Sequence, residues 1–241
     1  MSNELLLIIS IIGIYSGVLI WYYLFGNTGL MCFSVLATIA ANIEVLIVIN
    51  AFGMEQTLGN ILFGSTFLIT DILSETSGKK AANKTVKIGI VASITFIIIS
   101  QSWLLYTPAA SDWASPSIHA VFSNTPRLMI ASFVVYAVTQ KFDVWAYHKW
   151  WALTKHLCGD EHRFLWLRNN GSTLISQFFN TFLFTFGAFY GVYSIKTLMH
   201  IVLSSYVIFI VTSLADTPAI YLARYIYENK YKLPEKNEKA I

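Results

Sequence analysis

Charged residues are scarce in this sequence. In 241 residues there are 16 Lys and Arg and 13 Asp and Glu, together 12% of the chain, whereas soluble globular domains average roughly 25%. Hydrophobic residues make up 56%, and the mean hydropathy is +0.59. This composition excludes an ordinary cytosolic enzyme and a disordered chain.

Cysteine and clustered basic residues are also lacking. Cys32 and Cys158 are the only cysteines, and neither belongs to a C-x-x-C pair. The sequence therefore predicts no disulfide framework and no structural zinc site. The net charge is only +3 and no long basic run is present, so we expect no nucleic-acid partner.

Long apolar runs dominate the chain instead. They cover residues 5–25, 30–52, 58–73, 88–106, 128–147, 172–192 and 198–214. A helix needs about 20 such residues to cross the hydrocarbon of a bilayer, and only helices satisfy their own backbone groups there. We therefore predict an all-α, polytopic helical membrane protein with six to seven transmembrane helices. Residues 1–228 would form a single transmembrane transport domain, and 229–241 a polar cytoplasmic tail.

The connections between these runs alternate in Lys and Arg content. Residues 79–87, 149–168 and 224–239 are rich in them, whereas 107–126 has none and 193–197 has one. Because basic loops stay in the cytoplasm, seven crossings place the C-terminus inside. The N-terminal four residues hold no Lys or Arg, unlike a secretory signal, so we expect 5–25 to be a retained span. A re-entrant 58–73 segment is the alternative, with six crossings and the N-terminus inside.

Polar side chains inside these runs are the candidate substrate-binding residues, because an ionisable group in a span costs several kcal/mol unless it faces protein or water. The candidates are Asn42, Asp71, Glu75, Tyr136, Gln140, Asp143, Gln177, Asn180 and Asp216.

The spacing of the candidates places them on helix faces. Tyr136, Gln140 and Asp143 share one face with Ser132, and Ser172, Ser176 and Asn180 share another. We expect these two faces to meet around a cavity that reaches from mid-membrane towards the cytoplasm. The alternative is that the carboxylates lie at the interface and pair with Lys79, Lys80, Lys141 and Arg224.

Two short segments resemble each other. Residues 139–143 (TQKFD) are similar to 176–180 (SQFFN), and the predicted topology makes their helices antiparallel, as in inverted-repeat transporters. Five residues are also within the reach of chance, which is the reading that we favour.

Several motifs resemble the queuosine precursor transporter family, also called the vitamin uptake transporter family. They are residues 67–80 (FLITDILSETSGKK), 126–133 (PRLMIASF) with 140–143 (QKFD), 165–173 (LWLRNNGST) with 176–177, and 216–218 (DTP). The resemblance implies a multi-pass importer in the bacterial inner (plasma) membrane. It would carry 7-deazaguanine bases or queuine for the salvage of the tRNA nucleoside queuosine.

Two positions depart from the family pattern. The family usually has Asp where this chain has Asn180, and many relatives have a Lys near Asn42 that is absent here. Proton coupling through position 180 is therefore in doubt, and substrate preference could shift towards an aminomethyl base or queuine.

The candidate residues also suit such a ligand chemically. Carboxylates accept hydrogen bonds from ring N–H and amino groups, and amides pair with the acceptor edge. Aromatic rings stack on a flat base; the candidates are Tyr136, Phe142, Trp145, Phe178 and Phe179, although packing against lipid or core is the commoner role. Arg127 would attract the ligand, gate its entry or cap the interface.

Other functional classes fit less well. Residues 156–162 (HLCGDEH) contain metal-ligand types, but lie in a predicted basic loop without a second ligand group, and no cofactor is implied. An intramembrane hydrolase would need a deep pair such as Asp143 and Asp216. A substrate-binding subunit that needs an energising partner is a third alternative. We predict a transporter rather than an enzyme, bound to lipid and to one small molecule, with self-association left open.

Overall fold

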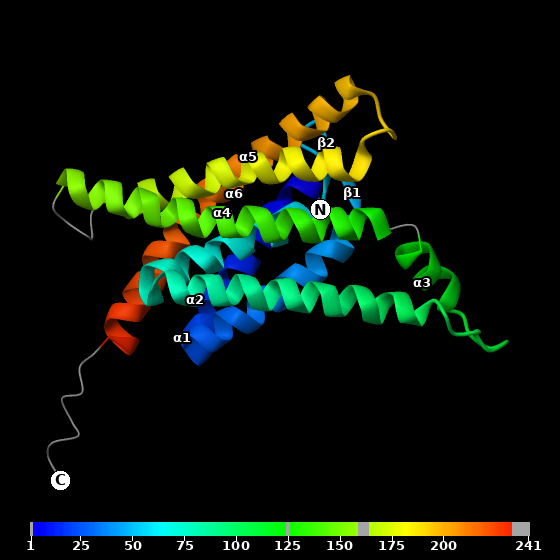
Figure 1. Ribbon diagram of the computed structural model, residues 1–241, viewed down its shortest axis with the longest axis horizontal. Helices are drawn as coiled ribbons and strands as arrows, with labels where there is room; N and C mark the ends of the chain where they lie inside the picture. Colours follow the sequence, from blue (N-terminus) through cyan, green and yellow to red (C-terminus); the bar gives the residue numbers. More distant parts are fainter. Residues whose placement is uncertain (1, 124–125, 159–163, 233–241) are drawn as a thin grey trace, which may run out of the picture.

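The computed structural model describes residues 2–123, 126–158 and 164–232, and they form a helical bundle (Figure 1). The elements are α1 (Asn3–Glu44), β1 (Val48–Ala51), β2 (Met54–Thr57), α2 (Gly59–Trp103), α3 (Ser115–Phe122), α4 (Pro126–Cys158), α5 (Leu165–Phe189), α6 (Ile195–Ile226) and a π-helical turn, η1 (Tyr227–Tyr231). The two short strands pair as one antiparallel hairpin. The predicted all-α class is confirmed.

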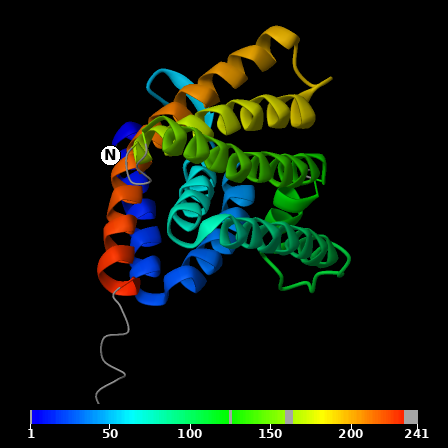
Figure 2. The same ribbon diagram turned by 60° about the vertical axis from the view of Figure 1, so that its left-hand side comes forward.

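The two longest helices each turn back on themselves at a glycine. Helix α1 has 42 residues and α2 has 45, and a straight helix of this size would be about 60 Å long, twice the hydrocarbon thickness. Gly26 (φ 58°) and Gly78 (φ 78°) break them, because glycine adopts positive φ without steric cost. The arms reverse direction at both breaks (Figures 1 and 2).

Within the described residues, these breaks yield seven long helical segments that run alternately in opposite directions. Three helices are long and apolar enough to cross a membrane by length and composition alone: Asn3–Glu44, Gly59–Trp103 and Ile195–Tyr231. Helices α4 and α5 are more polar. The predicted run 30–52 is too long, because helix α1 ends at Glu44 and residues 48–57 form the β-hairpin.

The bundle is apolar outside and polar inside. Ile12, Val91 and Ile98 are each more than 60% exposed, whereas Asp71, Gln140 and Asp143 are fully buried. Soluble proteins rarely expose such extensive apolar surface, but polar residues at helix interfaces are the normal arrangement in a bilayer. The distribution identifies a multi-pass membrane protein.

The two ends of the bundle differ. We call the end with the bends of α1 and α2, the end of α4, the start of α5 and the end of α6 the basic end, since many of the described Lys and Arg residues of the basic stretches gather there (Figure 1). The opposite end, with the β-hairpin, α3 and the α5–α6 turn, is the hairpin end. The described residues of the three basic stretches, 79–87, 149–158 with 164–168, and 224–232, therefore lie at the same end.

The last described turn packs over the bend of α1. The Tyr231 hydroxyl donates to the carbonyl oxygens of Tyr22 and Tyr23, both at 3.0 Å. The Lys230 ammonium bonds the Tyr23 carbonyl as well and lies 3.7 Å from the centre of the Tyr23 ring. Lys230 and Tyr231 thus hold the last described turn against the bend of α1.

Candidate functional site: a buried acid cluster below an aromatic cleft

Three carboxyl groups from different helices meet inside the bundle. Asp71 of α2, Asp143 of α4 and Asp216 of α6 are each at most 1% exposed, and the Thr70–Gln140 hydrogen bond joins α2 to α4 beside them. We call these three residues the acid cluster. Helix α5 contacts two of them within one turn, since Thr173 bonds Asp71 and Asn169 bonds Asp216.

The acid cluster is short of hydrogen-bond donors. The Thr173 hydroxyl donates to Asp71 Oδ2 at 3.0 Å, and Asn169 Nδ2 donates to Asp216 Oδ1 at 2.7 Å. Both oxygens of Asp143 and Oδ1 of Asp71 have no partner among the described residues. No Lys or Arg in the described part of the chain pairs with these three acids. Buried carboxyl oxygens without donors are costly, so the cluster is suited to a ligand rich in N–H groups.

Amide side chains surround the acids and cross-link the helices. Gln140 Nε2 donates to the Thr66 hydroxyl at 2.7 Å, and the Thr70 hydroxyl donates to Gln140 Oε1 at 3.2 Å. Asn180 Nδ2 donates to Gln177 Oε1 at 3.3 Å. Such bonds between or along membrane helices stabilise by about 1 kcal/mol each.

Two buried amide side chains, Asn169 and Asn170, are not among the nine residues predicted from the sequence. Asn170 Nδ2 donates to the Thr217 hydroxyl at 2.8 Å, and Asn169 holds Asp216. Their spacing from Thr173 and Gln177, at i+4 and i+8 from Asn169, places them on the polar face of α5. That register is the signal that could have found them.

The remaining predicted residues lie on either side of the acid cluster. Tyr136 is buried one to two turns towards the hairpin end, with its ring 6.0 Å from that of Phe63. Asn42 Oδ1 accepts a hydrogen bond of 2.5 Å from the Ser132 hydroxyl. Glu75 lies one turn from Asp71 towards the basic end.

Glu75 is fully engaged by protein groups. Arg168 donates to its two oxygens through Nε (3.0 Å) and Nη2 (2.5 Å), and Tyr147 donates at 2.7 Å. Arg224 lies 3.4 Å from the same carboxylate, and the Arg168 guanidinium stacks on Trp151 at 4.7 Å. Interface pairing with Arg224, the alternative reading from the sequence, therefore occurs at Glu75 but not in the acid cluster.

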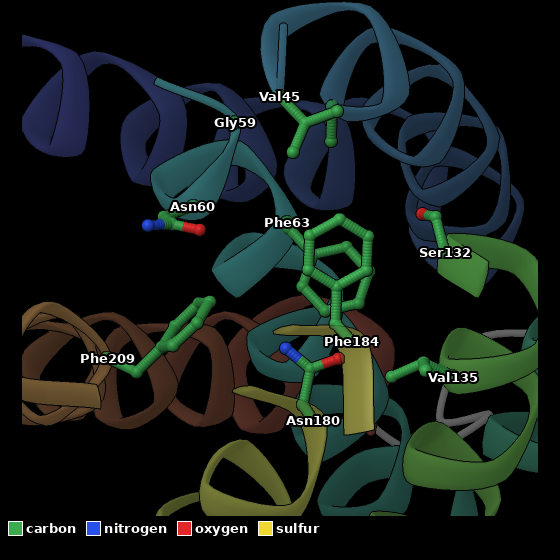
Figure 3. A pocket seen from close by; sticks show the side chains of 10 residues that line it. Val45, Gly59, Asn60, Phe63, Ser132, Val135, Asn180, Phe184 and Phe209 are labelled. Carbon is green, nitrogen blue, oxygen red and sulfur yellow. The ribbon is translucent and has the colours of Figure 1, made fainter. Parts of the chain in front are cut away.

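A cleft lies on the hairpin side of the acid cluster (Figure 3). Its enclosed volume is about 40 Å³, which is room for a few water molecules and well below the roughly 300–1,000 Å³ of occupied small-molecule sites. It is lined by Ala41, Val45, Gly59, Asn60, Phe63, Ser132, Val135, Asn180, Phe184 and Phe209. Among the nine predicted residues, Asn180 alone belongs to this lining. We call this space the aromatic cleft.

The cavity that the sequence predicts between the polar faces stays a prediction. It was expected to reach towards the basic loops, whereas the aromatic cleft lies nearer the β-hairpin. On the basic side of the acid cluster, Arg168 pairs with Glu75 and stacks on Trp151, and a separate cavity lies beyond these residues.

The aromatic residues at the cleft also differ from those expected. Trp145, Phe178 and Phe179 are 43–48% exposed on the outside of the bundle, and the Phe142 ring packs on Phe179 at 5.4 Å. Side-chain rings reach the cleft from Phe63, Phe184 and Phe209 instead.

Arg127 has a structural role, and part of the predicted 156–162 cluster lies outside the described residues. Arg127 donates to the carbonyls of Gly187 (3.1 Å) and Tyr190 (2.6 Å), which ties the start of α4 to the end of α5. No group of three metal-ligating residues occurs among the described residues. Residues 159–162 of the predicted 156–162 cluster lie outside the described residues, and so do residues 233–241 of the predicted tail.

The bundle, with its apolar outside and polar interior, defines a multi-pass helical membrane protein. The family model described as "Putative vitamin uptake transporter" matches residues 57–223. The chain belongs to this family, and is therefore a transport protein rather than an enzyme.

One curated relative is similar over most of the chain. It is the "Probable queuosine precursor transporter" of Bacillus subtilis (strain 168), which is 37% identical over 212 residues, 88% of this chain and 90% of the relative. No solved structure matches this chain.

Proposed function

We propose that this protein imports queuosine precursors, 7-deazaguanine bases or queuine, across the bacterial inner membrane. The observation that carries the proposal is the acid cluster, with three buried carboxyl groups from three helices and three oxygens that lack donors. The name of the Bacillus subtilis relative supports the choice of substrate.

The base would bind through complementary edges. A guanine-like ring presents adjacent N–H donors on one edge, which match the unpaired oxygens of Asp71 and Asp143. Its acceptor atoms match the amide groups of Gln140 and Gln177. Asn169 and Thr173 would hold Asp216 and Asp71 in position, since they already donate to these carboxyl groups.

The proposed orientation places the basic end in the cytoplasm. The described residues of the three Lys- and Arg-rich stretches lie together there, and loops rich in Lys and Arg are retained inside. The aromatic cleft would then face the outer side, where an imported base arrives.

Uptake of a radiolabelled 7-deazaguanine base, in cells that cannot synthesise queuosine precursors, tests this proposal. Asp143→Asn keeps the size of the side chain but removes a charged acceptor, and we expect uptake to fall at least about tenfold, since a hydrogen bond to a charged group contributes about 1.5–3 kcal/mol. Asp112→Asn, at an exposed loop acid, is the matched control. Full uptake by a correctly inserted Asp143→Asn protein would refute the site.

Two further variants of the experiment separate the remaining possibilities. Uptake by the purified chain alone in liposomes argues against a need for an energising partner. Asn180→Asp restores the family residue; we expect a changed pH dependence of uptake if this position takes part in proton movement, and an unchanged profile assigns Asn180 to ligand contact alone.

A further inference from the structure

The aromatic cleft is chemically distinct from the acid cluster below it. It has no charged lining residue, and three phenylalanine rings border it together with Asn60, Ser132 and Asn180 (Figure 3). On α2 the same helix face continues from Asn60 and Phe63 to Thr70 and Asp71, so the cleft and the cluster are consecutive along one helix.

The polar groups in the cleft have fixed hydrogen-bonding roles. Asn60 Oδ1 accepts from the Thr57 hydroxyl at 3.1 Å, while its Nδ2 is buried without a partner among the described residues. Asn180 uses Nδ2 on Gln177, which leaves Oδ1 as an acceptor. Ser132 donates its proton to Asn42 and is also left as an acceptor. One donor and two acceptors thus meet between aromatic rings.

We propose that the aromatic cleft is a separate entry subsite, which widens from its enclosed volume of about 40 Å³ to bind a flat, uncharged nitrogen heterocycle of purine size before that ligand reaches the acid cluster. The inference rests on the proposed function and extends it. The Phe63, Phe184 and Phe209 rings offer faces or edges to a heterocycle, as aromatic sites for bases do. The Asn60 amide donates to a ring acceptor, and Asn180 and Ser132 accept from ring N–H groups.

Binding of 7-deazaguanine to the purified full-length protein in detergent, measured by isothermal titration calorimetry, tests the subsite. Asn60→Ala and Phe184→Leu should each weaken binding about tenfold, the equivalent of one lost hydrogen bond or ring stack. Phe182→Leu is the matched control, because Phe182 is two residues away on the exposed face of α5. Monodisperse elution in size-exclusion chromatography confirms that each variant is folded.

The outcomes separate this inference from the proposed function. Binding in Asp143→Asn protein that has lost uptake, together with weaker binding in the cleft variants, supports the subsite. Wild-type affinity in both Asn60→Ala and Phe184→Leu overturns the subsite, even if uptake proves the transport function. A wild-type protein that binds the base in the cleft but does not take it up would refute the function and leave the subsite standing.

A second inference rests on the Glu75 contacts at the basic side of the acid cluster. Glu75 (α2), Tyr147 (α4), Arg168 (α5) and Arg224 (α6) join four helices in one buried network. Beyond it lies a cavity of about 200 Å³, which Glu75, Trp151 and Arg224 help to line. The network therefore separates this inner cavity from the acid cluster.

We infer that the Glu75–Arg168 network is the closed inner gate of the transport path. In a background without Cys32 and Cys158, a cysteine at Thr70 reports access to the acid cluster. Arg168→Met should raise its labelling by a membrane-impermeant thiol reagent from the basic side about tenfold, which corresponds to a shift of about 1.4 kcal/mol towards an open state.

Control variants keep the gate inference testable. Lys80→Gln, at an exposed lysine of the basic end, leaves the network intact and should leave labelling near the wild-type rate. If Arg168→Met does not fold, the Glu75→Gln/Arg168→Met double variant removes both charges and should still open the path. Unchanged labelling from the basic side in the folded variants would overturn the gate.

Discussion

Replacement of Arg168 by methionine should destabilise the protein strongly. The guanidinium is fully buried and makes two hydrogen bonds to Glu75, at 2.5 and 3.0 Å, and it stacks on Trp151. Without it, Glu75 keeps only the Tyr147 hydroxyl and the more distant Arg224. Loss of one partner of a buried pair costs about 3–5 kcal/mol because the other charge stays buried.

The expected change is large enough to measure by thermal unfolding in detergent. For a chain of this length, each kcal/mol corresponds to about 2–4 °C in Tm, so Arg168→Met should lower Tm by about 6–20 °C. Intrinsic tryptophan fluorescence reports the transition, because Trp151 lies against the guanidinium.

Two comparison variants test the reasoning behind this value. Arg224→Gln should lower Tm by no more than about 3 °C, since the Arg224 side chain is partly exposed and its contact is long. Glu75→Gln/Arg168→Met should recover much of the loss, because neither charge remains buried alone. A Tm for Arg168→Met within about 3 °C of wild type would refute the argument.

Further predictions concern packing and pH. Gly89→Ala should lower stability by about 1–3 kcal/mol, since the added Cβ would overlap the Tyr136 hydroxyl; Gly13→Ala, which meets no atom within 4 Å, should be neutral or slightly stabilising in the same Tm measurement. The Ser115 hydroxyl and the amides at the start of α3 donate to Asp112 and lower the pKa of that carboxyl. The ionised Asp112 carboxylate therefore stabilises the start of α3 fully above the ordinary carboxyl pKa, and this stabilisation is lost as the pH falls through the lowered pKa. Hydrogen exchange of these amides should lose protection on acidification, and Asp112→Asn should flatten that profile.

Helix periodicity predicted much of the polar interior. Gln140 and Asp143 on α4, and Gln177 on α5, lie on faces that do meet, because residues three and four apart share one side of a helix. Asp216 reaches the same level from α6. The family motifs also include Arg168 and Asn169, although their partners were not apparent from the sequence.

Other parts of the site could not be predicted because they depend on how helices are placed relative to one another. Phe184 faces the cleft and Phe178 the outside, yet both are phenylalanines in one apolar helix, and a bilayer gives both sides a similar composition. Glu75 is only one turn from Asp71, so spacing alone does not distinguish an ion-paired acid from an unpaired one. Arg168 makes that distinction, from 93 residues away.

The end of the second predicted run was misjudged for a local reason. Residues 45–52 (VLIVINAF) are apolar enough to extend a span, but Phe52 and Gly53 adopt positive φ and turn the chain into a hairpin. The Phe-Gly pair was the available turn signal.

The bend of α1 has a consequence for biosynthesis. The carbonyl oxygens of Tyr22 and Tyr23 accept hydrogen bonds from the Tyr231 hydroxyl, which lies 209 and 208 positions later in the sequence. A nascent chain thus makes its first reversal long before the tyrosine that covers it has been translated. The two arms of α1 therefore insert into the bilayer before their bend is covered, and Tyr231 covers the bend late in assembly.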